Sequence, residues 1–149
     1  MENDGRVATP FLGPYACSKF AIEALSDALR RELLPWDLHV AIIEPGRIAT
    51  PIWEKSYSAA TQLAAQLDPA SQVYYGEAMA ANLAQARRRR GGTPPQRVAE
   101  AIAHALTAAR PKTRYLVGWD VRLGAMLTRL PDRWLDALIA RQRGIKRAK

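Results

Sequence analysis

The sequence contains only one cysteine, Cys17, so no disulfide can form within the chain. No apolar run approaches the roughly 20 residues of a membrane-spanning helix, and the opening stretch MENDGRVATP lacks the basic and apolar regions of a signal peptide. The two histidines, His39 and His104, stand apart from any cluster of metal-ligating residues. These absences argue against a disulfide-rich secreted scaffold, a transmembrane segment and a metal centre, and they predict a cytoplasmic location. We interpret Cys17 as a small buried residue and both histidines as packing residues.

Acidic residues are too few to balance the basic ones, since 22 Lys and Arg against 14 Asp and Glu give a formal net charge of +8. Much of the excess lies in Arg87–Arg90 and in the closing stretch RQRGIKRAK. Such clusters could bind nucleic acid, an acidic partner or an anionic membrane. However, no aromatic residue lies among the arginines as base stacking requires, and Gly91 follows them as at the end of a helix, where cations complement the dipole. We therefore expect solvated charges and no nucleic-acid partner.

Repeats and low-complexity linkers are absent, and the apolar residues follow two periodicities. Two short apolar runs, 38–43 and 113–118, have the composition of buried parallel strands. The remaining apolar residues recur at helical spacing. The predicted helical segments cover about 14–34, 51–91 with a break near Asp68, 93–110 with Thr93 as its cap, and 123–138 in one or two helices around Pro131. This order of elements predicts a helix-rich α/β domain.

Tyr15 and Lys19 stand four residues apart near the start of the first predicted helix, so their side chains share one face. An ammonium group beside a phenol favours the phenolate, and such a tyrosine can exchange a proton with an alcohol or carbonyl oxygen. Lys19 keeps further donors for a ribose hydroxyl. The spacing alone is equally compatible with an exposed lysine beside a packed tyrosine.

The surrounding sequence is more specific than the pair. GPYACSKFAIEALSDALRREL followed by VAIIEPGRIATPIW closely resembles the short-chain dehydrogenase/reductase family, particularly its retinol- and steroid-type members. The resemblance implies the carboxyl-terminal part of a Rossmann-like doubly wound parallel sheet. It makes Tyr15 the catalytic proton donor or acceptor, and it makes Lys19 both a second catalytic residue and a ligand of the nicotinamide ribose. It also implies NAD or NADP as cofactor and a hydrophobic alcohol or carbonyl compound as substrate.

The same resemblance assigns the loop after the first predicted strand to the cofactor. Pro45, Gly46, Ile48 and Thr50 match the family's nicotinamide-contacting loop. The helical region 51–92 would then form an apolar lid over the substrate. The resemblance also implies packing of the first helix against a second subunit, so we expect a homo-oligomer or other self-association.

Two features of the family are missing from the sequence. The serine expected thirteen residues before Tyr15 is replaced by Glu2, and no glycine-rich turn for the dinucleotide occurs between a strand and a helix. We therefore expect residues 1–149 to form a single partial domain that lacks the amino-terminal dinucleotide-binding half and is inactive alone. The alternative is a non-catalytic remnant that acts as a helical interaction module or as a peripheral membrane or anion binder.

Overall fold

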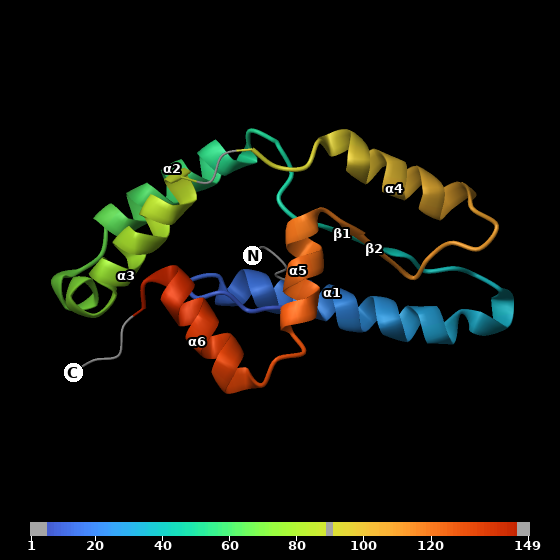
Figure 1. Cartoon of the computed structure of the whole chain (residues 1–149), viewed down its shortest axis with the longest axis horizontal. Coiled ribbons are helices and arrows are strands. Elements are labelled where there is room, and N and C mark those ends of the chain that lie inside the picture. Colours follow the sequence, from blue (N-terminus) through green and yellow to red (C-terminus); the bar gives the residue numbers. More distant parts are fainter. Residues whose placement is uncertain (1–5, 89–90, 146–149) are drawn as a thin grey trace. The chain divides into compact units, whose positions relative to one another are not determined.

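A computed structural model describes residues 6–88 and 91–145 of the chain (Figure 1). Three predictions concern residues outside the described ranges and are not tested by the structure. They are those for Glu2, for two arginines of the cluster 87–90 and for the last four residues of the basic tail. The chain divides into two compact units, one made of residues up to 49 with 92–130, the other of 50–91 with the residues from 131 onward. Each unit is described by itself.

The first unit holds two parallel strands, β1 (Ile42–Pro45) and β2 (Arg114–Val117), paired from Ile42 with Arg114 to Pro45 with Val117. The strands lie between two helices, α1 (Gly13–Glu32) on one face and α4 (Pro95–Thr107) on the other (Figure 1). The 3₁₀ turn η1 (Leu34–Trp36) follows α1, and α5 (Trp119–Leu127) follows β2. This arrangement confirms a helix-rich α/β fold, part of a Rossmann-like sheet with helices on both faces.

Helix α1 forms and ends where its sequence predicts. Pro14 occupies the first turn, where its missing N–H costs no hydrogen bond. Arg30 and Arg31 lie in the last turn, where cations complement the carbonyl end of the helix. Pro35 then lies within η1. In Figure 1 the helix runs antiparallel to β1, which brings its amino-terminal turn to the end of the unit where the strands finish.

Several predictions for this unit were wrong in detail. Strand β1 starts at Ile42 rather than Leu38, because β2 begins at Arg114 and offers no partner for the residues before Ile42. Cys17 is exposed, and Ala16 is the buried residue of α1 instead. His39, predicted to pack, is exposed, and its Nδ1 lies 3.2 Å from the carbonyl oxygen of Asp37. His104 does pack: its ring lies edge-on to that of Tyr115 with 5.6 Å between centroids, and its Nδ1 lies 2.8 Å from the Tyr115 hydroxyl oxygen.

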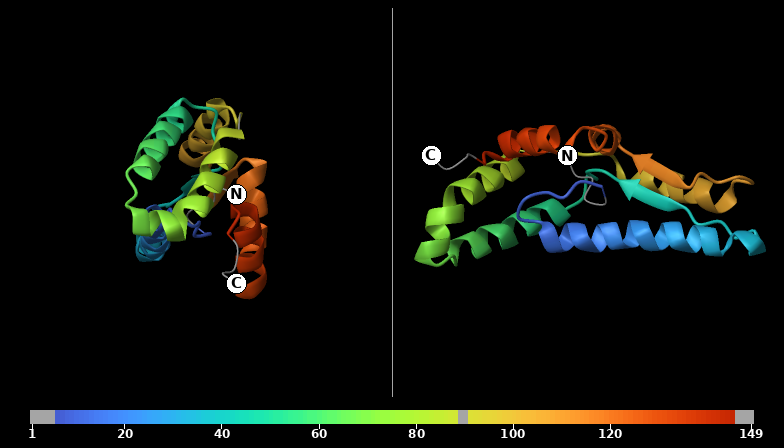
Figure 2. Two further views of the ribbon diagram at one scale, coloured as in Figure 1. Left: turned by 90° about the vertical axis from the view of Figure 1, so that its left-hand side faces the viewer. Right: turned by 90° about the horizontal axis from the view of Figure 1, so that it is seen from below.

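The second unit consists of helices in its described residues: α2 (Ile52–Ala65), α3 (Pro69–Arg88) and α6 (Asp132–Arg143). Helices α2 and α3 form a hairpin (Figure 2). The predicted break near Asp68 is confirmed, and its cause is a cap: the Ser71 N–H donates to Asp68 Oδ1 at 2.9 Å. No described helix is both long enough and apolar enough to cross a membrane.

Ion pairs fasten α1 to the strands. The guanidinium of Arg6 donates twice to Glu44, at 2.8 Å each, and the Glu44 side chain is only 7% exposed. Arg114 donates to Glu23 at 2.8 Å and to Asp27 at 3.0 Å, both on α1, and its Nε lies 3.5 Å from Glu44. Burial alone would lower the pKa of Arg114, but the hydrogen bonds to Glu23 and Asp27 raise it. The network therefore fixes the helix that carries Tyr15 and Lys19.

We expect Arg114→Met to lower the free energy of unfolding by about 2 kcal/mol or more, because it leaves three carboxylates without a shared cation. The matched control is Arg97→Met, which removes an arginine paired at 2.9 Å with Glu100 on an exposed surface. Exposed pairs contribute little, so the control should change stability by less than about 1 kcal/mol. Urea unfolding of the wild type and the two variants measures both effects. Equal losses of unfolding free energy would show that the Arg114 network stabilises the fold no more than an exposed ion pair does.

Acidification should weaken the same network. Hydrogen bonds from Arg30 and then Arg114 lower the pKa of Asp27 below its usual value. A carboxyl group whose pKa is lower in the folded state stabilises the fold above the unfolded pKa, and that contribution is lost as the pH falls through the folded value. Stability should therefore decline as the pH drops below about 4.

Candidate active site

Tyr15 and Lys19 lie one turn apart on the amino-terminal part of α1. The structure brings them together, as their spacing predicts: Lys19 Nζ lies 5.2 Å from the centroid of the Tyr15 ring, a cation–π geometry. The Tyr15 side chain is 49% exposed, so a ligand can approach it. A cation beside an accessible phenol is suited to proton transfer at an alcohol or carbonyl oxygen.

The loop after β1 is held by hydrogen bonds to its backbone. The Gly46 N–H donates to the carbonyl of Val117 at 2.9 Å, at the end of β2. The Arg47 N–H donates to Asp120 Oδ2 at 2.7 Å, in the first turn of α5. These bonds fix the turn that follows Pro45 to two elements that are distant from it in sequence. Ligands of open α/β sheets bind at this carboxyl end of the strands.

A second set of bonds ties the loop to the segment before α4. The Thr93 N–H donates to the carbonyl of Arg47 at 2.8 Å, and the Ala49 N–H donates to the carbonyl of Thr93 at 3.0 Å, so that Ile48 pairs with Thr93 in a parallel bridge. Gly92 makes this approach possible, because a Cβ there would lie 2.9 Å from the Arg47 oxygen and the Ala49 nitrogen. The bridge thus pairs the chain just before residues 50–91 with the chain just after them.

Thr93 therefore has another role than the predicted one. The residue that caps α4 is Pro94, and no side chain makes a capping hydrogen bond there. The main chain of Thr93 is engaged with the loop after β1 instead. Sequence reasoning also missed Asp120. A glycine and an acidic residue closely following a strand, as in Gly118 and Asp120, are the signal that could have pointed to a turn held by a carboxylate.

The predicted cofactor residues are divided between the units. Pro45, Gly46 and Ile48 belong to the first unit. Strand β1 finishes at the end of this unit where the amino-terminal turn of α1 also lies (Figure 1). Thr50 is the first residue of the second unit. The structure thus places Tyr15 and Lys19 in the same unit as most of the predicted loop.

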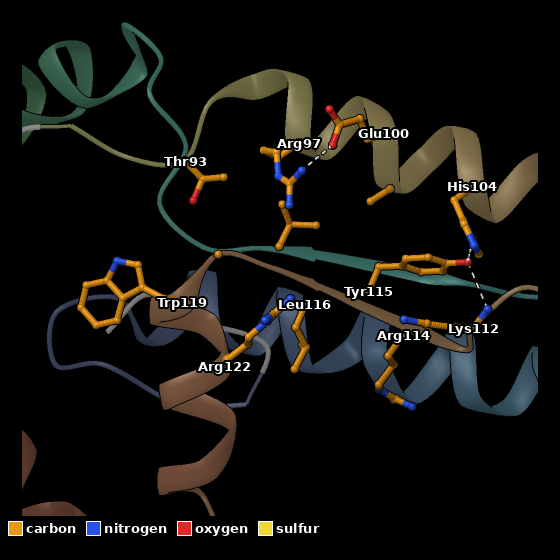
Figure 3. A pocket seen from close by; sticks show the side chains of 13 residues that line it. Thr93, Arg97, Glu100, His104, Lys112, Arg114, Tyr115, Leu116, Trp119 and Arg122 are labelled. Carbon is orange, nitrogen blue, oxygen red and sulfur yellow. Dashed lines mark hydrogen bonds and ion pairs between the residues drawn. The ribbon is translucent and has the colours of Figure 1, made fainter.

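A cavity of about 620 Å³ opens between α4, β2 and the start of α5 (Figure 3). None of the predicted site residues lines it. Its polar groups are largely paired with one another: Arg97 donates to Glu100, and His104 contacts the hydroxyl of Tyr115. The cavity and the predicted site residues are therefore separate parts of the first unit.

Comparisons with known proteins point to one family. The model of the family described as short chain dehydrogenase matches residues 3–61, which include Tyr15, Lys19 and the loop after β1. Retinol dehydrogenase 5 of Mus musculus is 39% identical over 142 residues, which cover 91% of this chain and 44% of the relative. An NADPH-dependent 3-dehydrocapnine reductase of Ornithobacterium rhinotracheale is 38% identical over 136 residues, which cover 90% and 46%.

A further relative is the 17-beta-hydroxysteroid dehydrogenase type 6 of Rattus norvegicus, 37% identical over 142 residues, which cover 91% of this chain and 44% of that protein. The chain thus spans less than half the length of these curated relatives. The matches run along nearly all of its own length and agree with the parallel strands and flanking helices of the first unit. The chain belongs to the short-chain dehydrogenase/reductase family.

Proposed function

We propose that this chain supplies the proton-transfer residues and the nicotinamide-binding loop of an NAD- or NADP-dependent oxidoreductase that interconverts an alcohol and a carbonyl group. The observation that carries the proposal is the position of the Lys19 ammonium over the Tyr15 ring at an accessible helix terminus. The membership of the chain in a dehydrogenase family supports it. When bound, the nicotinamide supplies or accepts the hydride.

The residues of the chain have distinct roles in this proposal. The Tyr15 hydroxyl gives a proton to the carbonyl oxygen during reduction and takes one from the alcohol during oxidation. Lys19 stabilises the phenolate by its charge and donates to the nicotinamide ribose. The main chain from Pro45 to Ile48 contacts the nicotinamide, and it fits that task because hydrogen bonds from several elements already hold its conformation. Thr50 adds a hydroxyl donor at the end of the loop.

We further propose that the region 51–92 forms a lid over a hydrophobic substrate. Large apolar side chains are strongly exposed on its helices, with Leu63 at 60%, Val73 at 82% and Tyr74 at 81%. The Ile48–Thr93 bridge, within the first unit, pairs the chain just before this region with the chain just after it. The names of the relatives, which refer to retinol, a hydroxysteroid and 3-dehydrocapnine, suggest substrates with large apolar parts.

The test uses a fusion of this chain with the part of mouse retinol dehydrogenase 5 that has no counterpart in it, called the fusion protein below. We expect it to reduce NAD or NADP with retinol or a 17-hydroxysteroid, and to do so far more slowly with a small polar alcohol such as glycerol. Formation of the reduced cofactor, followed by absorbance, measures the rates. A folded fusion protein that binds cofactor but oxidises none of these alcohols would contradict the proposed function.

A further inference from the structure

We propose that Asp120 is a positioning residue that sets the conformation of the loop after β1. Its Oδ2 accepts the Arg47 N–H at 2.7 Å across 73 residues of sequence. A hydrogen bond to a charged acceptor is roughly twice as strong as one between neutral groups, so this contact is a main restraint on the turn. The effect of Asp120 on cofactor binding rests on the proposed function. The hydrogen bond by which Asp120 restrains the loop does not depend on that function.

Two glycines leave room for the carboxylate. A Cβ on Gly46 would lie 2.5 Å from Asp120 Cγ and 2.6 Å from Oδ2, and a Cβ on Gly118 would lie 2.5 Å from Oδ1. Gly118 has a φ of +123°, so its backbone requires glycine in any case. Gly46 does not have a positive φ, so its backbone conformation does not require glycine. Glycine fits there because the Asp120 carboxylate occupies the space that a Cβ would fill.

The position of Asp120 on α5 explains why the group is a carboxylate. It lies in the first turn of this helix, where the amino end of the dipole favours negative charge, and no side chain caps the helix. The same carboxylate accepts the hydrogen bond from the loop, so one negative charge stabilises both the amino end of α5 and the turn after β1. The placement of α5 after β2 thereby determines where Pro45–Ile48 can contact a nicotinamide.

A double-mutant cycle in the fusion protein tests the inference. Asp120→Ala should accelerate hydrogen exchange at the Arg47 amide about tenfold or more, because its acceptor is lost. Gly46→Ala should also accelerate it, since the added methyl group collides with the carboxylate. The double variant should exchange no faster than Asp120→Ala alone, because truncation of the aspartate removes the collision. Effects that multiply in the double variant would overturn the inference.

Cofactor titration separates positioning from general destabilisation. Asp120→Ala should raise the dissociation constant of the fusion protein for its cofactor several-fold, and Asp120→Asn, which keeps a neutral acceptor oxygen, should raise it less. The control is Asp132→Ala, which removes a first-turn carboxylate from α6 in the other unit and should change neither exchange at Arg47 nor cofactor affinity. If Asp120→Ala does not fold, the smaller rises in Arg47 exchange and in the dissociation constant expected of Asp120→Asn carry the test. An Asp120→Asn protein equal to the wild type in both, or equally fast Arg47 exchange in Asp132→Ala, would overturn the inference.

The outcomes also distinguish this inference from the proposed function. Fast Arg47 exchange in Asp120→Ala together with an inactive wild-type fusion protein would refute the oxidoreductase and leave the restraint standing. Normal activity of the wild type together with unchanged Arg47 exchange in Asp120→Ala would refute the restraint and leave the oxidoreductase standing. Accelerated exchange with an unaltered cofactor dissociation constant would overturn the link between Asp120 and the cofactor.

Discussion

Replacement of Tyr15 by phenylalanine is expected to lower the turnover of the fusion protein by at least about a hundredfold, because it removes the group that we propose transfers the proton. The substitution deletes one oxygen at the exposed amino-terminal turn of α1, so the fold should be unaffected. The cofactor dissociation constant should stay nearly unchanged, since the proposed function assigns the contacts with the nicotinamide to Lys19 and the loop after β1. Steady-state rates and a fluorescence titration of the same preparation measure both quantities.

The matched control is Tyr115→Phe. Its hydroxyl accepts the Lys112 N–H at 3.0 Å and contacts His104, on the face of the strands that α4 covers. Loss of that hydroxyl should lower thermal stability without a comparable loss of turnover. A Tyr15→Phe enzyme with a rate close to that of the wild type would exclude Tyr15 as the proton-transfer residue.

The 149-residue chain by itself is expected to bind neither NAD nor NADP with useful affinity and to show no dehydrogenase activity. A dinucleotide is held chiefly by its pyrophosphate at the helix behind a glycine-rich turn and by its adenosine ribose. The sequence contains no such turn, and its glycine pair Gly91–Gly92 lies where the segment 50–91 ends. Contacts at the nicotinamide end alone must offset at least about 4 kcal/mol of lost translational and rotational freedom.

Calorimetric titration of the purified chain with each cofactor tests this expectation, and the fusion protein serves as the positive control. Heat from the fusion protein and none from the chain would locate the affinity in the part that the chain does not contain. A micromolar dissociation constant for the chain alone would mean that its residues form a dinucleotide site that the sequence does not reveal.

Helices were predictable because their signals are local. The apolar spacing, Pro14 and the terminal arginines predicted α1 to within about two residues, and Asp68 marked the start of α3. The start of β1 was not predictable in the same way. The residues 38–41 are as apolar as a strand, but a strand needs a partner, and the partner begins at Arg114.

The candidate site divides along the same line. The pair Tyr15 and Lys19 could be found from a spacing of four, because helix geometry alone brings the two side chains together. The supports of the loop could not, because Asp120 and Thr93 meet Arg47 only through the tertiary fold. The self-association expected of the chain stays a prediction. The apolar side chains of Ile22 and Leu25 on α1, both more than half exposed, are available for it.

The most direct measurement compares Tyr15→Phe with Lys19→Met in the fusion protein, with turnover and the cofactor dissociation constant determined for each. We expect Tyr15→Phe to lose turnover and keep its cofactor affinity, and Lys19→Met to lose both, because in the proposed function only the lysine serves the ribose as well as the phenol. A Lys19→Met protein that keeps wild-type turnover and wild-type cofactor affinity would contradict the assignment of this pair as the catalytic centre.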